Sequence, residues 1–199
     1  MAHKKRADVF YKRLKEDAES ALTFSYDCRK NLVLPKFPDQ AAYYLGQMYL
    51  YNFAVCQGNS YSSQTPENMF AYAWLETDFT KSSNQIASTV HQNLSQQAYF
   101  EGITNICLFA DGHCFIPLDR VFGNLEREFR KIDVIEKPEL YMNIMKKHAT
   151  VIRLGGEHCP CEIFKTYADG QIKEPGNWHF KFQKAQKISS PKPRTRICA

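Results

Sequence analysis

The sequence lacks any apolar run near the roughly 18 residues that a membrane-crossing helix needs, so no membrane segment is predicted. It begins MAHKKRADVF, which is basic and has none of the apolar character of a signal peptide. Secretion is therefore not expected, and the seven cysteines are predicted to be reduced thiols of an intracellular protein. A phosphate-cradling glycine loop and a nucleophile elbow are also missing, so neither of these two site types is predicted.

The composition is that of a folded protein. Hydrophobic residues make up 44% of the 199 positions and aromatic residues 14%, which is enough for one sizeable core and too much for a disordered chain. The net charge of +5 is compatible with a nucleic-acid partner but is too small to establish one.

Hydrophobic periodicity divides the chain into four parts. We expect a basic helix in residues 1–20, a core in 21–135, a helix with a small β region in 136–182, and a basic disordered tail in 183–199. The core pattern is strand, strand, strand, helix, strand, at residues 21–26, 46–58, 69–75, 78–97 and 105–110. A helical crossover before the last strand makes that strand parallel to one of the first three. The predicted class is α/β with a mixed sheet, in the order found in ribonuclease-H-like nucleases and transposases.

Acidic residues follow two of these strands. Asp27 ends the first strand and Asp111 the fourth. If the two strands are neighbours, both carboxylates leave the sheet at its carboxyl edge, where open α/β sheets place their ligands. Taken singly, each aspartate is more simply a turn residue.

The segment after Asp111 adds two further acids. Pro117 suits the first turn of a helix, whose apolar face would contain Leu118, Val121, Phe122, Leu125, Phe129 and Ile132. Asp119 and Glu126 are seven residues apart and share a stripe beside that face, with Gly123 between them. Mg²⁺ prefers oxygen ligands, and a two-metal site needs two or three converging carboxylates. Asp27, Asp111 and one acid of this helix could provide them.

Basic and soft side chains complete the set of candidates. Arg29, Lys30 and Arg120 flank the acids and are predicted to contact a nucleic-acid phosphate backbone, the alternative being ordinary solvated charges. The sequence EHCPCE holds His158, Cys159 and Cys161, but its C-x-C spacing is not that of a zinc site and no second pair follows, so zinc is not expected.

Several long phrases resemble a family of transposon-derived, transposase-related proteins of unassigned function that is widespread in animal genomes. They are FSYDCRKNLVLPKFPDQAAYY (24–44), QMYLYNFAVCQG (47–58), WLETDFTKSSNQIAS (74–88), LFADG (108–112), HCFIPLDRVFGNLE (113–126) and WHFKF (178–182). The resemblance covers most of the chain from His3 to about Phe182. It implies a ribonuclease-H-like (DDE-type) core, a nuclear location, DNA as partner, and cleavage and strand transfer that depend on Mg²⁺ or Mn²⁺.

By this resemblance Asp27 and Asp111 match the family's first two catalytic, metal-binding acids. The third is Glu126 or Asp119, because both lie in the matching HCFIPLDRVFGNLE phrase.

The chain departs from the family pattern between Gly112 and His113. There the family has a further block of glycine-, glutamine- and asparagine-rich sequence, a helix and a strand, whereas here Asp111-Gly112 runs directly into His113. A genomic lesion, a skipped exon or a wrong gene model would each give this junction. We also expect no separate DNA-binding module ahead of the matching region. We therefore expect a degenerate transposase-derived domain, with a non-catalytic nucleic-acid or protein binding module as the alternative.

Overall fold

The computed structural model describes residues 21–39, 44, 46–58, 63–96, 105–110 and 117–161, and for residues 21–22 and 105–110 it describes the backbone alone. The predicted helix in 1–20 and the predicted tail in 183–199 lie outside these ranges.

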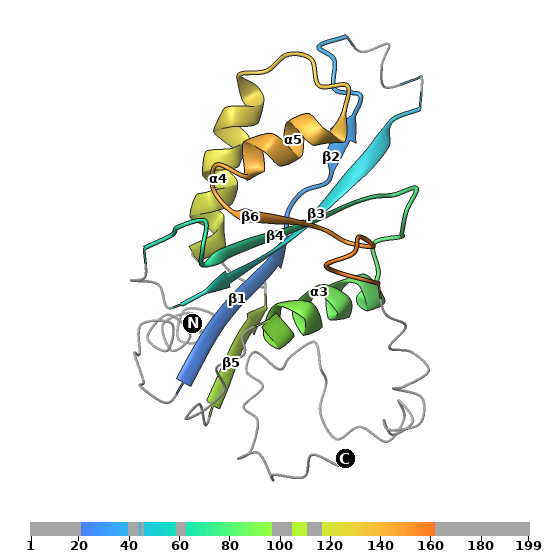
Figure 1. Cartoon of the computed structure of the whole chain (residues 1–199). Coiled ribbons are helices and arrows are strands. Elements are labelled where there is room, and N and C mark those ends of the chain that lie inside the picture. Colours follow the sequence, from blue (N-terminus) through green and yellow to red (C-terminus); the bar gives the residue numbers. More distant parts are fainter. Residues whose placement is uncertain are drawn as a thin grey trace, which may run out of the picture.

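Six of the described strands form one mixed sheet, and three described helices pack against it (Figure 1). The strands are β1 (Ala21–Cys28), β2 (Leu32–Leu34), β3 (Met48–Gln57), β4 (Met69–Leu75), β5 (Asn105–Ala110) and β6 (Thr150–Arg153); the helices are α3 (Ser83–Gln96), α4 (Pro117–Arg130) and α5 (Pro138–Met145). The strand order is β5-β1-β3-β4-β6, with β2 beside the start of β3. The β1/β5 and β4/β6 pairs are parallel, and the other pairs are antiparallel.

The predicted α/β class and the run of three strands, a helix and a further strand are confirmed by β1, β3, β4, α3 and β5. The short strand β2 was not predicted; it lies directly before Pro35, which made the segment look like a loop. Helix α3 begins at Ser83, later than the predicted residue 78, and the helix predicted at the start of 136–182 is α5, which ends at Met145.

The small β region that we predicted after α5 is described only in part. Its first strand, β6, pairs with β4 and so extends the main sheet. Residues 162–182 of this region lie outside the described residues.

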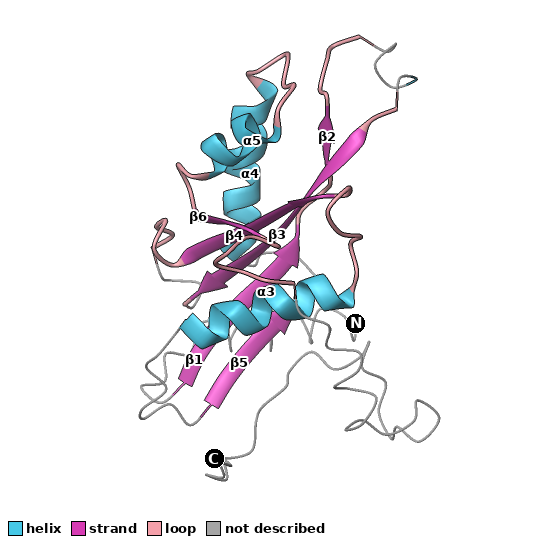
Figure 2. Ribbon diagram, turned by 45° about the vertical axis from the view of Figure 1, so that its right-hand side comes forward, coloured by secondary structure: helices cyan, strands magenta, loops and turns pink. Residues whose placement is uncertain are grey.

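The sheet has an apolar core on each face, and Figures 1 and 2 show α4 and α5 on one face and α3 on the other. Side chains alternate along β3, so that Ala54 and Cys56 face α4 and α5 whereas Phe53 and Val55 face the α3 side. Four residues of the predicted apolar face of α4 are buried, since Leu118, Val121, Leu125 and Phe129 are each at most 4% exposed, whereas Phe122 and Ile132 are only partly buried. Burying side chains of this size stabilises the fold by about 1.5–3 kcal/mol each, which fixes α4 on the sheet.

Helix α3 is unusual because its most buried side chains are polar. These are Gln85, Ser88, Thr89, Gln92 and Asn93, whereas the apolar residues Ile86, Val90 and Leu94 are only partly buried. Gln92 accepts a hydrogen bond from the Tyr72 hydroxyl at 2.5 Å and donates one to the carbonyl oxygen of His158 at 3.2 Å. The polar side of α3 is therefore covered by the segment that follows β6.

Three described glycines have backbone angles that other residues adopt only at a cost. Gly46 and Gly155 both have φ of +82°, and Gly58 has φ of +107°. A Cβ atom at Gly155 would come within 2.5 Å of Cε2 of Phe79, whereas one at Gly46 would meet no described atom within 4 Å. The turn after β6 thus needs glycine for two reasons, its conformation and the close approach of an aromatic ring.

Candidate functional site

The parallel pairing of β1 with β5 places the carboxyl ends of the two strands side by side. In this register Tyr26 lies opposite Ala110. The condition that we set for a shared carboxyl edge, that the fourth predicted strand should neighbour the first, is therefore met. Asp111, the residue after Ala110, lies outside the described residues.

Asp27 is the last residue but one of β1, and its side chain is half-buried. Its Cα partner on β3 is Ala54, which belongs to the core beneath α4 and α5, so Asp27 points to the same face of the sheet as α4. One carboxylate oxygen accepts a hydrogen bond from the backbone N–H of Cys28 at 2.6 Å. β1 and α4 thus contribute acids to one face of the sheet.

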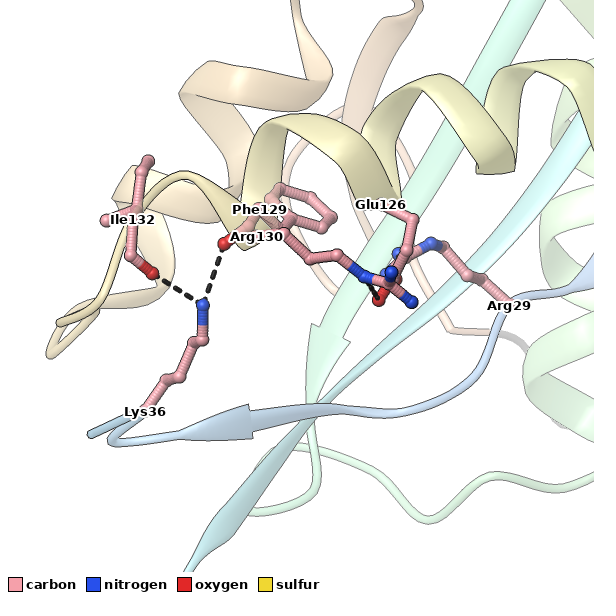
Figure 3. A network of polar contacts seen from close by, with 6 residues as sticks. All are labelled: Arg29, Lys36, Glu126, Phe129, Arg130 and Ile132. Atoms are coloured by element: carbon pink, nitrogen blue, oxygen red, sulfur yellow. Dashed lines mark hydrogen bonds and ion pairs between the residues drawn. The ribbon is translucent and has the colours of Figure 1, made fainter. Parts of the chain in front are cut away.

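Arg29 follows β1 and is the most buried charged residue near this edge, with only 5% of its side chain exposed. Its Nη2 donates to Oε2 of Glu126 at 2.5 Å, and its guanidinium lies over the ring of Phe129, 4.8 Å from the centroid (Figure 3). Arg130 approaches the other carboxylate oxygen of Glu126 at 3.4 Å. Burial lowers the pKa of Arg29, and the charge of Glu126 opposes that shift.

The two candidate acids of α4 have different surroundings. The carboxylate of Glu126 is engaged by Arg29 and Arg130, and 48% of the side chain is exposed. Asp119 lies exposed in the first turn of α4. Gly123, between them, faces open space, as its position in the stripe predicts. Glu126 can therefore bind a cation only after Arg29 releases it.

The described residues do not by themselves form a metal centre. Within the described ranges, no three His, Cys, Asp or Glu side chains lie close enough together to hold a metal ion, and this includes His158, Cys159 and Cys161. Oxygen donors of the kind that Mg²⁺ prefers are present in Asp27 and Glu126, but a guanidinium already neutralises the second. This arrangement does not fit a bound divalent cation without Asp111 and without release of Glu126.

The three cations predicted to contact phosphate lie in different environments. Lys30 and Arg120 are exposed, whereas Arg29 is buried and paired, so its interpretation as a solvated charge is wrong. The cause is its position directly after a strand, beneath α4, where its side chain reaches the carboxylate of Glu126.

A pocket of about 260 Å³ opens beside this ion pair. Its lining contains four cations, Arg29, Lys30, Lys36 and Arg130, and one acid, Glu126. Its remaining walls are Asn31, Leu32, Val33, Phe129 and Tyr141.

Sequence reasoning missed Lys36, which sits between two prolines in what looked like a loop. Its Nζ donates to the carbonyl oxygens of Phe129 at 2.7 Å and of Ile132 at 2.5 Å, and so caps the C-terminal end of α4 (Figure 3).

Comparisons of the chain with protein-family models, with curated proteins and with solved structures found no match. Among the described residues no helix is both long enough and apolar enough to cross a membrane.

Proposed function

We propose that the chain is a transposase-derived domain with a ribonuclease-H-like core, whose ancestral Mg²⁺-dependent phosphodiester cleavage and strand transfer has degenerated. The observation that carries this proposal is the parallel pairing of β1 with β5, on the side of β1 opposite to its antiparallel partner β3. Asp27 lies at the carboxyl end of β1 in this pair. The order β5-β1-β3-β4 and the acids of α4 on the same face support it further. The ancestral role of Asp27, Asp111 and a third acid, Glu126 or Asp119, follows from the sequence resemblance.

The Arg29–Glu126 ion pair supports the degenerate state. A metal ligand must offer its carboxylate to the cation, and here the carboxylate of Glu126 faces two guanidinium groups. Arg29 is buried and stays beside β1, so a metal ion at Glu126 would compete with its guanidinium for the carboxylate. The described arrangement therefore supports no metal-dependent step.

The ancestry is tested by an experimental structure of the full chain. We expect the carboxyl groups of Asp27 and Asp111 to lie close enough to bind one cation together. At a metal–oxygen distance of about 2.1 Å, their nearest oxygens would be no more than about 4 Å apart. Carboxylates on opposite faces or edges of the sheet would refute the ancestry.

The loss of activity is tested by a nuclease assay with labelled duplex DNA in Mg²⁺ or Mn²⁺. We expect no cleavage by the wild-type chain. Cleavage that is abolished by Asp27→Ala and by Asp111→Ala, but retained by Asp133→Ala as a control at an exposed aspartate, would contradict degeneration and support a working site.

The second candidate function is a non-catalytic nucleic-acid binding module. The specific observation in its favour is the pocket beside β1, in which four cations face a single acid. A gel-shift assay in EDTA tests it, because phosphate contacts need no divalent metal and weaken as salt rises.

A further inference from the structure

We infer that the pocket between the end of β1 and the C-terminal half of α4 is a binding site for a phosphate group. The inference deepens the binding function proposed above and rests on it. Its test contains no divalent metal, so its failure would be distinct from a failure of the nuclease ancestry.

The first argument is the charge balance of the pocket. Arg29, Lys30, Lys36 and Arg130 line it together with one acid, Glu126, so the lining carries a net charge of about three positive units. A concave surface with charges of one sign attracts a ligand of the opposite sign. The ligand should therefore be an anion.

The second argument is that the guanidinium of Arg29 is incompletely paired. Nη2 is bonded to Glu126, but Nη1 is buried and has no hydrogen-bond partner among the described residues. A buried donor on a charged group is costly when it has no acceptor. Burial also lowers the pKa of Arg29, and the half-exposed carboxylate of Glu126 opposes this shift without cancelling it. A second anion would supply the missing acceptor.

The third argument concerns the identity of that anion. The planar fork of an arginine matches the oxygens of phosphate in two parallel hydrogen bonds. Lys30 is exposed and Arg130 has 79% of its side chain exposed, so both can close on the outer oxygens of a bound phosphate. Lys36 neutralises the carbonyl oxygens at the end of α4, which would otherwise repel an anion.

The fourth argument is that the pocket has a movable wall. Glu126 is 48% exposed and is shared between Arg29 and Arg130. Its carboxylate can turn outward with Arg130 and leave the guanidinium of Arg29 to the phosphate. Phosphate and the Glu126 carboxylate therefore compete for the same donor. Removing the charge of Glu126 should for this reason strengthen phosphate binding.

The test measures binding of inorganic phosphate by calorimetry in EDTA, using the full chain. Glu126→Gln removes the competing charge and is expected to tighten phosphate binding about tenfold, as for one charge-assisted hydrogen bond. Glu128→Gln, on the same helix and paired with Lys131 outside the pocket, is the control and should leave binding unchanged. Lys30→Gln should weaken binding several-fold, and Lys131→Gln should not.

Two oligonucleotides of one sequence, with and without a 5′-phosphate, identify the source of the group. Tighter binding of the phosphorylated strand indicates a terminal phosphate. If both strands bind equally and inorganic phosphate displaces them, the group recognised is a phosphate of the nucleic-acid backbone. The inference is overturned if neither phosphate nor either strand binds, or if Glu126→Gln fails to tighten phosphate binding while thermal melting shows the variant folded.

Discussion

Removing the carboxylate of Glu126 should destabilise the fold far more than removing a neighbouring carboxylate on the same helix. Glu126→Ala leaves the guanidinium of Arg29 without its acceptor in a site where only 5% of the side chain reaches solvent. Breaking a fully buried pair costs about 3–5 kcal/mol, and a hydrogen bond to a charged group contributes about 1.5–3 kcal/mol. Because Glu126 is 48% exposed and water screens its charge, the lower range applies, and we expect a loss of about 2 kcal/mol.

The matched control is Glu128→Ala. Glu128 lies two residues along α4 and pairs at 2.7 Å with Lys131, whose side chain is 68% exposed. Both substitutions replace glutamate by alanine in one helix, so changes in helix propensity and in the charge near the helix end largely cancel between them. Surface ion pairs contribute little, and Glu128→Ala should leave stability nearly unchanged.

Urea denaturation and thermal melting measure the difference. For a chain of this size, about 2 kcal/mol corresponds to a melting temperature lower by about 4–8 °C. The denaturant slope should stay the same, since neither variant changes the surface exposed on unfolding. Equal melting temperatures for the two variants would refute the reasoning, because they would mean that Arg29 finds another partner or water when Glu126 is removed.

Two further predictions concern a pair of glycines and a thiol. Gly46→Ala should cost about 1 kcal/mol of stability for its positive φ alone, and Gly155→Ala should cost about 1–3 kcal/mol more, because its added methyl group also overlaps the ring of Phe79. Chemical denaturation of both variants measures these losses, and equal losses would rule out the ring contact. Burial raises the pKa of the Cys56 thiol from 9.0 to about 11. The stability linked to this shift is fully present below about pH 9 and is lost as the pH rises toward 11. Cys56→Ala should therefore lose less stability than the wild type between these two pH values. Urea midpoints that fall equally with pH in the two proteins would contradict this.

The sequence predicted the sheet well because its signals are local. Strand β4 was predicted with the observed bounds, since MFAYAWL is a dense aromatic and apolar run between polar turns. The apolar face of α4 was also predicted, because helical spacing alone decides which side chains point inward. The helical crossover predicted that β5 would run parallel to one of the three earlier strands but left open which one, and the structure pairs it with β1.

The candidate site was predicted less fully because its contacts are not local. Arg29 and Glu126 are 97 residues apart, and no periodicity couples them. The same holds for Lys36 and the end of α4, 93 residues away. The sequence placed Glu126 on the stripe of α4 that faces the end of β1 but could not show that an arginine rather than a metal ion would face it. Whether Asp111 joins Asp27 stays a prediction.

The parallel attachment of β6 to β4 has a consequence for where the domain can be divided. Position 135 looked like the end of the core, yet the chain returns through α5 and hydrogen-bonds along the far side of β4. A fragment ending at 135 would leave the backbone of β4 open as an edge strand, ready to pair with other molecules. It would also strip Tyr141, Ile144 and Met145 from the interior. The smallest independently folding piece of this protein must therefore reach at least to Cys159, which is fully buried in the second apolar core.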